Sequence, residues 1–235
     1  DAKFEAIEVD PEYLGSWIEK DFRPYLQGCA VTIPHKTEIL KYVDTLSDAA
    51  IKIGAVNTLY WDQGKIIGTN TDGVGALRAI QSTMPKLEKK KVLILGAGGA
   101  SRAIIFALQM AGAYVAIWNR TTDKAQQLAE EFEAGFVEEI TEEAFGLFDL
   151  VINTTSVGLK EWKSVVPSEY WSAEQVAFDI VYDPLETKFL SDAADAGCEY
   201  ITGDQMLVHQ ALEQFRIWHG VTLEPEVMGN AFFII

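Results

Sequence analysis

The sequence predicts an α/β fold with a largely parallel sheet. Strand-like apolar runs alternate with amphipathic stretches almost throughout the 235 residues, which is the pattern of such folds. No polar residue interrupts the run Val92-Leu93-Ile94-Leu95, as expected for a strand that is covered on both faces. With 49% hydrophobic residues the chain can bury a substantial core, and its length corresponds to one large or two modest domains.

The first third of the chain carries the signals of a small α/β unit. Pro11 follows Asp10, a pair typical of a helix start, because proline fits the first helical position. Asp62-Gln63-Gly64 separates two strand-like runs and indicates a hairpin turn. In chain order we expect a strand at 4–9, a helix from residue 10, a strand at 29–33, helices at 36–46 and 47–53, a hairpin over 55–68 and a helix from Asp72 to about Met84.

The rest of the chain predicts a doubly wound unit. Pro85 and the charged run 86–91 interrupt the periodicity, and we interpret that run as a solvated connector. Strands and helices then alternate in the manner of a doubly wound nucleotide-binding domain. We expect strands at 91–95, 114–118, 149–153 and 176–181 and helices at 99–111, 122–133, 186–196, 203–219 and 225–235.

The charge balance and the cysteine content exclude several classes of partner. Thirty-five Asp and Glu against 19 Lys and Arg give a net charge of −16, so the surface should repel nucleic acid and anionic lipid. No apolar run is long enough to span a bilayer, and the chain begins at Asp1 without a secretory leader. Cys29 and Cys198 fit no disulfide framework or zinc spacing, and the three histidines lack helical ligand spacing, so we expect a metal-free protein in the reducing cytoplasm.

A glycine-rich segment from Gly96 to Ser101 predicts a dinucleotide site. It follows a buried strand and opens a helix, which is the context that this fingerprint requires. Gly96 would permit the tight turn, Gly98 would let backbone N–H groups approach a pyrophosphate, and the small Ser101 would allow the helix to pack closely on the strand. The alternative is a glycine turn needed for packing alone. We assign cofactor contacts to Gly96, Ala97, Gly98, Gly99 and Ala100.

The end of the next strand predicts a preference for NADP. An NAD-binding protein often carries an acidic residue there for the ribose hydroxyls, whereas this sequence has Asn119-Arg120-Thr121 with Lys124 one turn later. A guanidinium offers charge and forked donors to a 2′-phosphate. The alternative is that Arg120 is a solvated loop residue, but its position favours the ligand.

Three further motifs place polar groups at strand ends, where ligands collect. They are Val31-Thr32-Ile33-Pro34-His35-Lys36, Gly54-Ala55-Val56-Asn57-Thr58 and Gly68-Thr69-Asn70-Thr71-Asp72-Gly73. With these motifs the sequence resembles the shikimate dehydrogenase family, which includes quinate/shikimate dehydrogenases, over nearly the whole chain. The resemblance implies an N-terminal α/β substrate domain at 1–72, a Rossmann-type NADP-binding domain at 73–206 and C-terminal helices at 207–235 that pack back on the substrate domain.

The resemblance also implies roles for individual residues. Lys36 matches the family's catalytic lysine and Asp72 its partner, in an active site between the two domains. The implied substrate contacts are Thr32, Asn57, Asp72, Tyr182 and Gln210, and the further implied cofactor contacts are Thr155, Ser156, Ile180, Gly203 and Met206. The implied reaction is the NADP-linked interconversion of 3-dehydroshikimate and shikimate, in a monomer or homodimer.

The chemistry of a lysine and a carboxylate fits this reaction. Reduction of a ketone by hydride transfer develops an alkoxide that must be stabilised and protonated, and a Lys/Asp pair can do both. Lys36 would donate the proton while Asp72 orients it. The alternative for Lys36 is a surface lysine at a helix start, and the alternative for Asp72 is an aspartate that caps a helix. Asp72 can be a helix cap and a catalytic partner at once.

The sequence departs from the family in two places. The strand and Ser-x-Ser turn that normally precede the segment starting at Ala2 are absent, and Ala30 replaces an asparagine of many relatives. Because those serine hydroxyls hold the substrate carboxylate in relatives, we expect this chain as given to bind NADP but to bind substrate poorly. The functions left open are a shikimate dehydrogenase, a quinate/shikimate dehydrogenase and a non-catalytic dinucleotide-binding module.

Overall fold

The computed structural model describes residues 3–232, with side chains through residue 229, and its contacts divide the chain into two compact units. The first unit runs from Asp1 to Asn70 and the second from Thr71 to Ile235. The domain limits expected from the sequence differ from this division. They ended the first domain at residue 72, and they had the helices of residues 207–235 pack back on that domain. In the structure helix α9 (Gly203–His219) packs along helix α4 (Asp72–Thr83), so both helices belong to the second unit.

The first unit contains a four-stranded sheet in the order β1-β3-β4-β2. Strands β3 and β4 form the predicted hairpin, in which Tyr60 pairs with Ile67. Its turn places Gln63 at φ 48° and Gly64 at φ 76°, the two successive positive values of a type I′ turn. The strand bounds are β1 Gly28–Ala30, β2 Thr45–Leu46, β3 Thr58–Asp62 and β4 Lys65–Thr69.

Short helical segments cover this sheet. Four of them follow one another without a break from Pro11, and Ile18 and Phe22 anchor them in the core with Leu59 and Ile66 of the sheet. Helix α3 begins after Ser47, whose Oγ accepts a hydrogen bond of 3.1 Å from the Ala50 amide. The segments are η1 Pro11–Tyr13, α1 Leu14–Trp17, η2 Ile18–Phe22, α2 Arg23–Tyr25, η3 Glu38–Lys41 and α3 Asp48–Ile53.

Three expectations for the first unit were wrong or too long. Residues 4–9 form no strand, and Phe4 and Ile7 are 78% and 51% exposed, since no described strand pairs with them. The strand expected at 29–33 ends at Ala30, where the chain turns toward Pro34. The helix expected at 36–46 is the 3₁₀ turn η3, because residues 45–46 instead pair with β4 in parallel.

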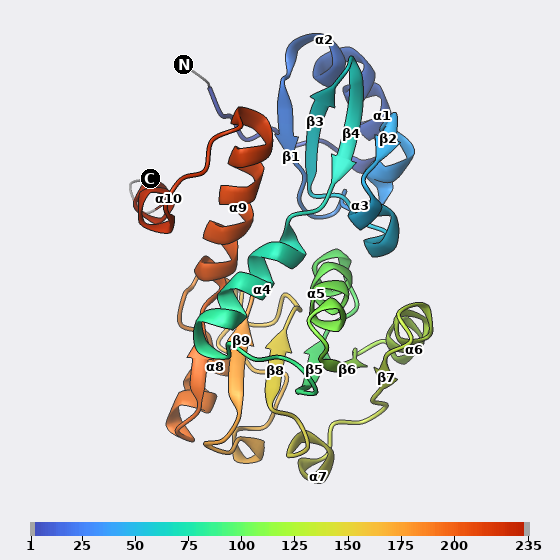
Figure 1. Cartoon of the computed structure of the whole chain (residues 1–235). Coiled ribbons are helices and arrows are strands. Elements are labelled where there is room, and N and C mark those ends of the chain that lie inside the picture. The colour runs from blue at the N-terminus through green and yellow to red at the C-terminus, as the bar shows by residue number, and fades with distance from the viewer. Residues whose placement is uncertain (1–2, 233–235) are drawn as a thin grey trace. The chain divides into compact units, whose positions relative to one another are not determined.

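The second unit is a parallel sheet of six strands in the order β10-β9-β8-β5-β6-β7, which confirms the doubly wound prediction (Figure 1). The chain leaves the central strand β5 toward β6 and β7, then returns to build β8, β9 and β10 on its other side. The strand bounds are β5 Lys91–Leu95, β6 Tyr114–Trp118, β7 Gly135–Phe136, β8 Leu150–Asn153, β9 Val176–Asp179 and β10 Glu199–Ile201.

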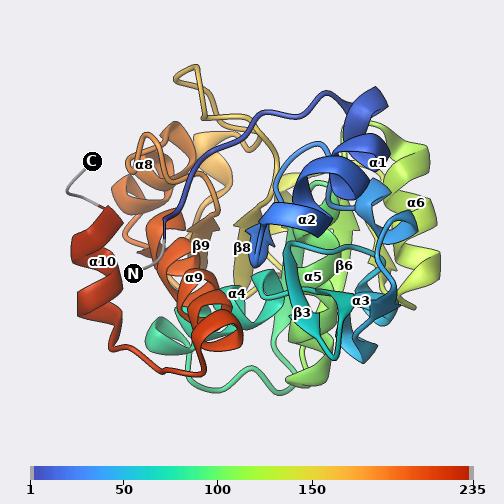
Figure 2. The same ribbon diagram turned by 90° about the horizontal axis from the view of Figure 1, so that it is seen from above.

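Alternate residues of these strands face two separate cores. Helices α4, α5, α6 and α9 cover the core that contains Ile94 and Ile152, while α7 and α8 cover the core that contains Leu93 and Val151. Figure 2 shows α8 beside β9. The remaining bounds are α5 Gly99–Met110, α6 Thr122–Glu131, α7 Glu142–Phe145, η4 Ser168–Tyr170, α8 Lys188–Asp195 and α10 Pro225–Phe232.

The helices and long strands of the second unit confirm the sequence pattern, with small differences at their ends. The short strands β7 and β10 were missed, because two or three residues carry no periodic signal. Thr71, not Asp72, occupies the N-cap of α4, and its side chain makes no capping hydrogen bond. Residues 233–235 of the last predicted helix lie outside the described residues. No helix among the described residues is long and apolar enough to cross a membrane.

Candidate functional site

The glycine-rich turn has the geometry of a phosphate-binding loop. Gly96 has φ 121°, and a Cβ there would lie 2.5 Å from Thr154 Oγ1, so both conformation and space require glycine. Gly98 precedes the first turn of α5, and a Cβ built on it would meet nothing within 4 Å. The turn therefore leaves open space in front of a helix N-terminus, which suits the pyrophosphate of a dinucleotide.

Hydrogen bonds to Ser101 and Thr154 hold this turn in place. The Gly98 amide donates to Ser101 Oγ at 3.0 Å, and that hydroxyl lies 2.7 Å from Thr154 Oγ1. Thr154 Oγ1 donates in turn to the Leu95 carbonyl at 2.8 Å. Ser101 is fully buried, as the close packing expected from its small size requires. Its hydroxyl also ties the turn to Thr154, the residue that follows β8.

The turn lies where the strand order reverses. It follows β5, the strand at which the order changes direction. The chain builds β6 and β7 on one side of β5 and then β8, β9 and β10 on its other side. Ligands of open α/β sheets bind at this switch point, outside the carboxyl ends of the strands. The carboxyl ends of β6, β8 and β9 carry the predicted residues Arg120, Thr155 and Ile180, so the sheet collects these segments at one edge.

The segment after β6 presents its basic groups to solvent. Arg120 and Lys124 are exposed, and neither forms an ion pair within the described part of the chain. Asn119 Nδ2 donates to the Thr121 carbonyl at 2.9 Å, and the Lys124 amide donates to the same carbonyl at 3.1 Å. These bonds fix the turn between β6 and α6 while leaving both cationic side chains available to an anion.

Sequence reasoning missed Asp179, the last residue of β9. Its side chain is fully buried, and its Oδ1 accepts from the Val181 amide and from Asn153 Nδ2, both at 3.0 Å. Thr187 Oγ1 donates to Oδ2 at 2.7 Å. Burial raises the pKa of Asp179 to about 6, although these hydrogen bonds oppose the shift. An aspartate that ends the apolar run 176–178 was the available signal, because charged residues are rarely buried without partners.

Close approaches of backbone position the residues on α9. A Cβ at Gly203 would lie 2.4 Å from the Val181 carbonyl oxygen, so the helix begins directly against the segment after β9. A Cβ at Gly75 would lie 2.8 Å from both Gln210 Cβ and the Met206 carbonyl oxygen, so α4 and α9 nearly touch. Thr71 Oγ1 reaches Gln210 Oε1 at 3.4 Å. The predicted residue Gln210 thus lies against Thr71 at the start of α4, and Asp72 is the next residue along the chain.

Two other predicted residues of this unit differ in exposure. Tyr182 is exposed in the loop after β9, where a ligand could reach it. Met206 is buried in the core that α4 and α5 line. The structure therefore gives Met206 a packing role at the least, and its predicted cofactor contact stays a prediction.

The structure brings the predicted residues of the first unit together. The Val56 amide donates to the Lys36 carbonyl, and the Val31 amide donates to the Asn57 carbonyl, each at 2.7 Å. These bonds place the loop that carries Thr32 and Lys36 beside the segment that carries Asn57. Lys36 is half-buried and Thr32 is exposed. Asn57 is buried, and its Oδ1 accepts from Thr58 Oγ1 at 2.6 Å.

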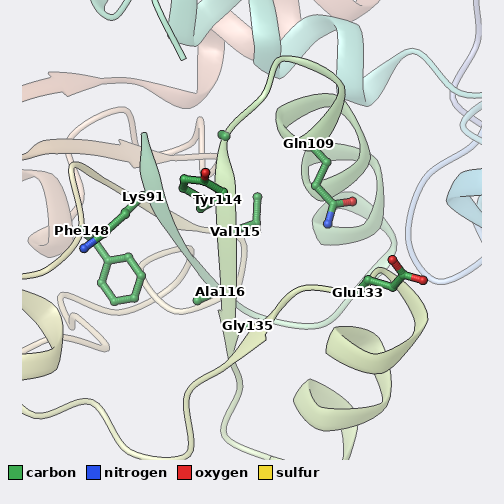
Figure 3. Close-up of a pocket in the computed structure, with 9 residues that line it drawn as sticks. Lys91, Gln109, Tyr114, Val115, Ala116, Glu133, Gly135 and Phe148 are labelled. Atoms are coloured by element: carbon green, nitrogen blue, oxygen red, sulfur yellow. The ribbon is translucent and has the colours of Figure 1, made fainter. Parts of the chain in front are cut away.

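A hollow of about 450 Å³ lies elsewhere on the second unit (Figure 3). Lys91 and Tyr114 in its lining are the first residues of β5 and β6, so it opens at the amino ends of these strands. It contains none of the predicted site residues. Within residues 3–232, no group of three or more His, Cys, Asp or Glu side chains could hold a metal ion.

Three family models match successive parts of the chain. The model described as the shikimate dehydrogenase substrate binding domain matches residues 1–59. The model described as shikimate / quinate 5-dehydrogenase matches residues 78–160. The model described as the shikimate 5'-dehydrogenase C-terminal domain matches residues 205–231.

Individual proteins match both units of the chain. The shikimate dehydrogenase (NADP(+)) of Methanococcoides burtonii is 45% identical over 229 residues, which are 92% of this chain and 84% of that protein. The crystal structure of shikimate dehydrogenase from Aquifex aeolicus superimposes with a TM-score of 0.91 at 39% identity, over 95% of this chain and 84% of that one. A Thermus thermophilus shikimate 5-dehydrogenase in complex with NADP(H) and shikimate gives 0.88 at 39% identity, with the same coverage. Each of these similarities covers more than nine-tenths of this chain, and the chain belongs to the shikimate dehydrogenase family.

Proposed function

We propose that this protein is an oxidoreductase that reversibly reduces 3-dehydroshikimate to shikimate with NADPH. The observation that carries the proposal is the similarity to a relative solved with NADP(H) and shikimate, which extends over 95% of the chain. The chain also has a lysine and an aspartate at the positions that the family motifs indicate, Lys36 and Asp72. A binding module would have no need of this pair.

The cofactor is assigned to the carboxyl edge of the large sheet. The turn from Gly96 to Ala100 receives the pyrophosphate, because it combines open space with the N-terminus of α5. Arg120 and Lys124 receive the 2′-phosphate, and their exposure leaves their charges available to it. The bound cofactor supplies the hydride. Thr155, Ser156, Ile180, Gly203 and Met206 are the remaining proposed contacts, with Asn119 and Thr121 beside the phosphate.

Lys36 is the proposed proton donor. Its ammonium stabilises the negative charge that develops on the substrate oxygen and then transfers a proton to it. Asp72, buried in the first turn of α4, orients the lysine and the reacting hydroxyl. The substrate's other polar groups are assigned to Thr32, Asn57, Tyr182 and Gln210.

A steady-state assay tests the proposal and separates its alternatives. The chain as given and a chain completed at its N-terminus with the strand and Ser-x-Ser turn of relatives are each assayed with shikimate and with quinate, with NADP and with NAD. We expect turnover with shikimate and NADP in the completed chain and little in the chain as given, and Lys36→Ala should abolish most of the turnover of the completed chain. The control is Lys41→Ala, which removes an exposed lysine of η3 that bonds Glu38 at 2.8 Å.

The other results of this assay identify the alternatives. Faster turnover of quinate would identify a quinate dehydrogenase. NADP binding without turnover of either substrate by the completed chain would identify a dinucleotide-binding module and would contradict the proposed activity.

We also propose a cytoplasmic location, supported by Cys29 and Cys198, which are both unbridged thiols as the reducing cytoplasm keeps them. The protein is proposed to act as a monomer or a homodimer. Light scattering on the purified chain measures which of the two it forms.

A further inference from the structure

We propose that Asp179 is a positioning residue, which holds the two cofactor-facing segments after β8 and β9 in one fixed arrangement. This inference rests on the proposed function, since it takes Thr155, Ser156, Ile180 and Gly203 as cofactor contacts. Asp179 itself is buried and is not proposed to touch the cofactor. Its effect would pass through the backbone of both segments.

The two strand ends meet at a side-chain pair. Asn153 and Asp179 are the last residues of β8 and β9 and lie opposite each other in the parallel register. Both side chains belong to the face of the sheet that α8 covers, because residues at alternate positions, Val151 and Ala177, lie in that core. Asn153 Nδ2 donates to Asp179 Oδ1 at 3.0 Å and joins the two ends directly.

Asn153 passes this connection to the segment after β8. Its Oδ1 accepts from the Thr155 amide at 3.1 Å and from Thr155 Oγ1 at 2.7 Å. Its Nδ2 also donates to the Val157 carbonyl at 3.1 Å, and the Val157 amide donates to Thr155 Oγ1 at 3.1 Å. The segment 154–157 is thereby folded around one buried amide, with the exposed Ser156 at its outer side.

Asp179 holds the segment after β9 through two further donors. The Val181 amide bonds Oδ1 at 3.0 Å, which fixes the backbone whose carbonyl oxygens lie against Gly203. Thr187 Oγ1 bonds Oδ2 at 2.7 Å and also accepts from the Leu190 amide at 3.3 Å as the N-cap of α8. One carboxyl therefore links the segments 154–157 and 180–182 with the start of a helix.

A carboxylate suits this position because each of its three hydrogen-bond partners is a donor. Val181 N–H, Asn153 Nδ2 and Thr187 Oγ1 all offer hydrogens, and an ionised carboxylate accepts from all of them without placing a proton. An apolar residue of the same size would leave these donors unpaired in a buried site, where unpaired groups are costly. An asparagine at this position keeps Oδ1, which still accepts from the Val181 amide and Asn153 Nδ2. Only the bond to Thr187 changes direction, because the asparagine amide would donate where Oδ2 accepts. Geometry rather than charge is thus what the site requires.

The test compares the NADPH affinities of Asp179 variants, measured by fluorescence titration of the full chain, with that of a matched control at the residue before the same strand. Gln175 precedes β9 and is likewise buried, and its Nε2 bonds the carbonyls of Phe145 and Phe148 at 3.1 Å at the other end of the sheet. We expect Asp179→Ala to weaken NADPH binding at least tenfold and Asp179→Asn to stay within threefold of wild type. Gln175→Ala should change the NADPH affinity less than twofold, although it should lower the melting temperature about as much as Asp179→Ala does.

A second pair of variants decides the matter if Asp179→Ala does not fold. Thr187→Val removes one donor of the network, and Thr141→Val removes the matching N-cap of α7, where the Ala144 amide bonds Thr141 Oγ1 at 3.2 Å. We expect Thr187→Val to weaken NADPH binding at least threefold. Thr141→Val should leave the NADPH affinity unchanged. Unchanged NADPH affinity in a folded Asp179→Ala or in Thr187→Val, or equal losses in a variant and its control, would overturn the inference.

Failure of the proposed function gives a different result. Wild-type protein that does not bind NADPH would contradict the proposed cofactor and not the network itself. In that case hydrogen exchange still measures the network, since Asp179→Asn should leave residues 153–158 and 180–187 protected while Thr187→Val exposes both. Exchange that rises in only one of the two segments would contradict the linkage.

Discussion

Replacing Gly75 with alanine should push α9 away from α4. A Cβ at this position would lie 2.8 Å from both Gln210 Cβ and the Met206 carbonyl oxygen and 2.9 Å from the Gln210 amide nitrogen. These atoms belong to the backbone and Cβ of α9, so no side-chain rotation can relieve the contact. Because carbon atoms pack at about 3.5–4.0 Å, the two helices must separate by about 0.7 Å.

Two opposing effects set the change in stability. Alanine is favoured over glycine inside a helix by about 1 kcal/mol. Overpacking of a buried contact costs about 1–3 kcal/mol, and this contact cannot relax locally. Because the contact cannot relax locally, the cost should fall in the upper part of that range, about 2–3 kcal/mol, so we expect Gly75→Ala to lower the free energy of unfolding by about 1–2 kcal/mol.

The same shift should reach the proposed site. It moves Gln210 and lengthens its 3.4 Å contact with Thr71 Oγ1, next to Asp72. A misplacement approaching 1 Å can cost up to about 100-fold in rate, so kcat/KM for shikimate should fall about tenfold or more.

Urea unfolding and steady-state kinetics measure both effects. The control is Gly229→Ala in α10, where an added Cβ would meet nothing within 4 Å. Helix propensity alone acts there, so this variant should gain up to about 1 kcal/mol and keep its activity. A Gly75→Ala protein as stable and as active as wild type would refute the reasoning.

Three other predictions concern charged residues. Arg120→Ala should reduce the ratio of NAD to NADP dissociation constants by about tenfold or more, as a lost charge-assisted contact of about 1.5–3 kcal/mol requires, and an unchanged ratio in calorimetry would contradict it. Asp72→Asn and Lys36→Ala should each lower kcat by about 100-fold or more while NADPH affinity stays within about twofold, and near-normal turnover would remove the residue from the mechanism. Because burial raises the folded-state pKa of Asp179 from 3.8 to about 6, its carboxyl favours the folded state fully below pH 4, and this contribution is lost as the pH rises through 6. Urea unfolding should therefore show Asp179→Asn gaining roughly 2.4 kcal/mol on wild type between pH 4 and pH 7, whereas parallel pH profiles would contradict the buried charge.

The sequence alone determined the winding of the large sheet and the chemistry of the glycine turn. Strands β5, β6 and β8 each carry enough apolar residues for their period to be recognised, and helices α5 and α9 begin at or next to glycines. Local patterns of this kind need no knowledge of distant residues. The positive φ of Gly96 and the basic pair after β6 are likewise local properties, so they could be predicted, whereas the close approach of Thr154 to Gly96 comes from the tertiary fold.

Tertiary structure decided what depends on distant partners. Residues 4–9 have the composition of a strand but form none, because a strand exists only where another pairs with it. Residues 45–46 show the converse. The sequence pattern predicts a helix there, but pairing with β4 makes the segment a strand. The network around Asp179 joins residues from 153 to 187 through hydrogen bonds, and it arises from burial at two adjacent strand ends rather than from any motif. Periodicity records which side of an element is apolar, but a buried polar group is satisfied by whatever donors the fold brings to it.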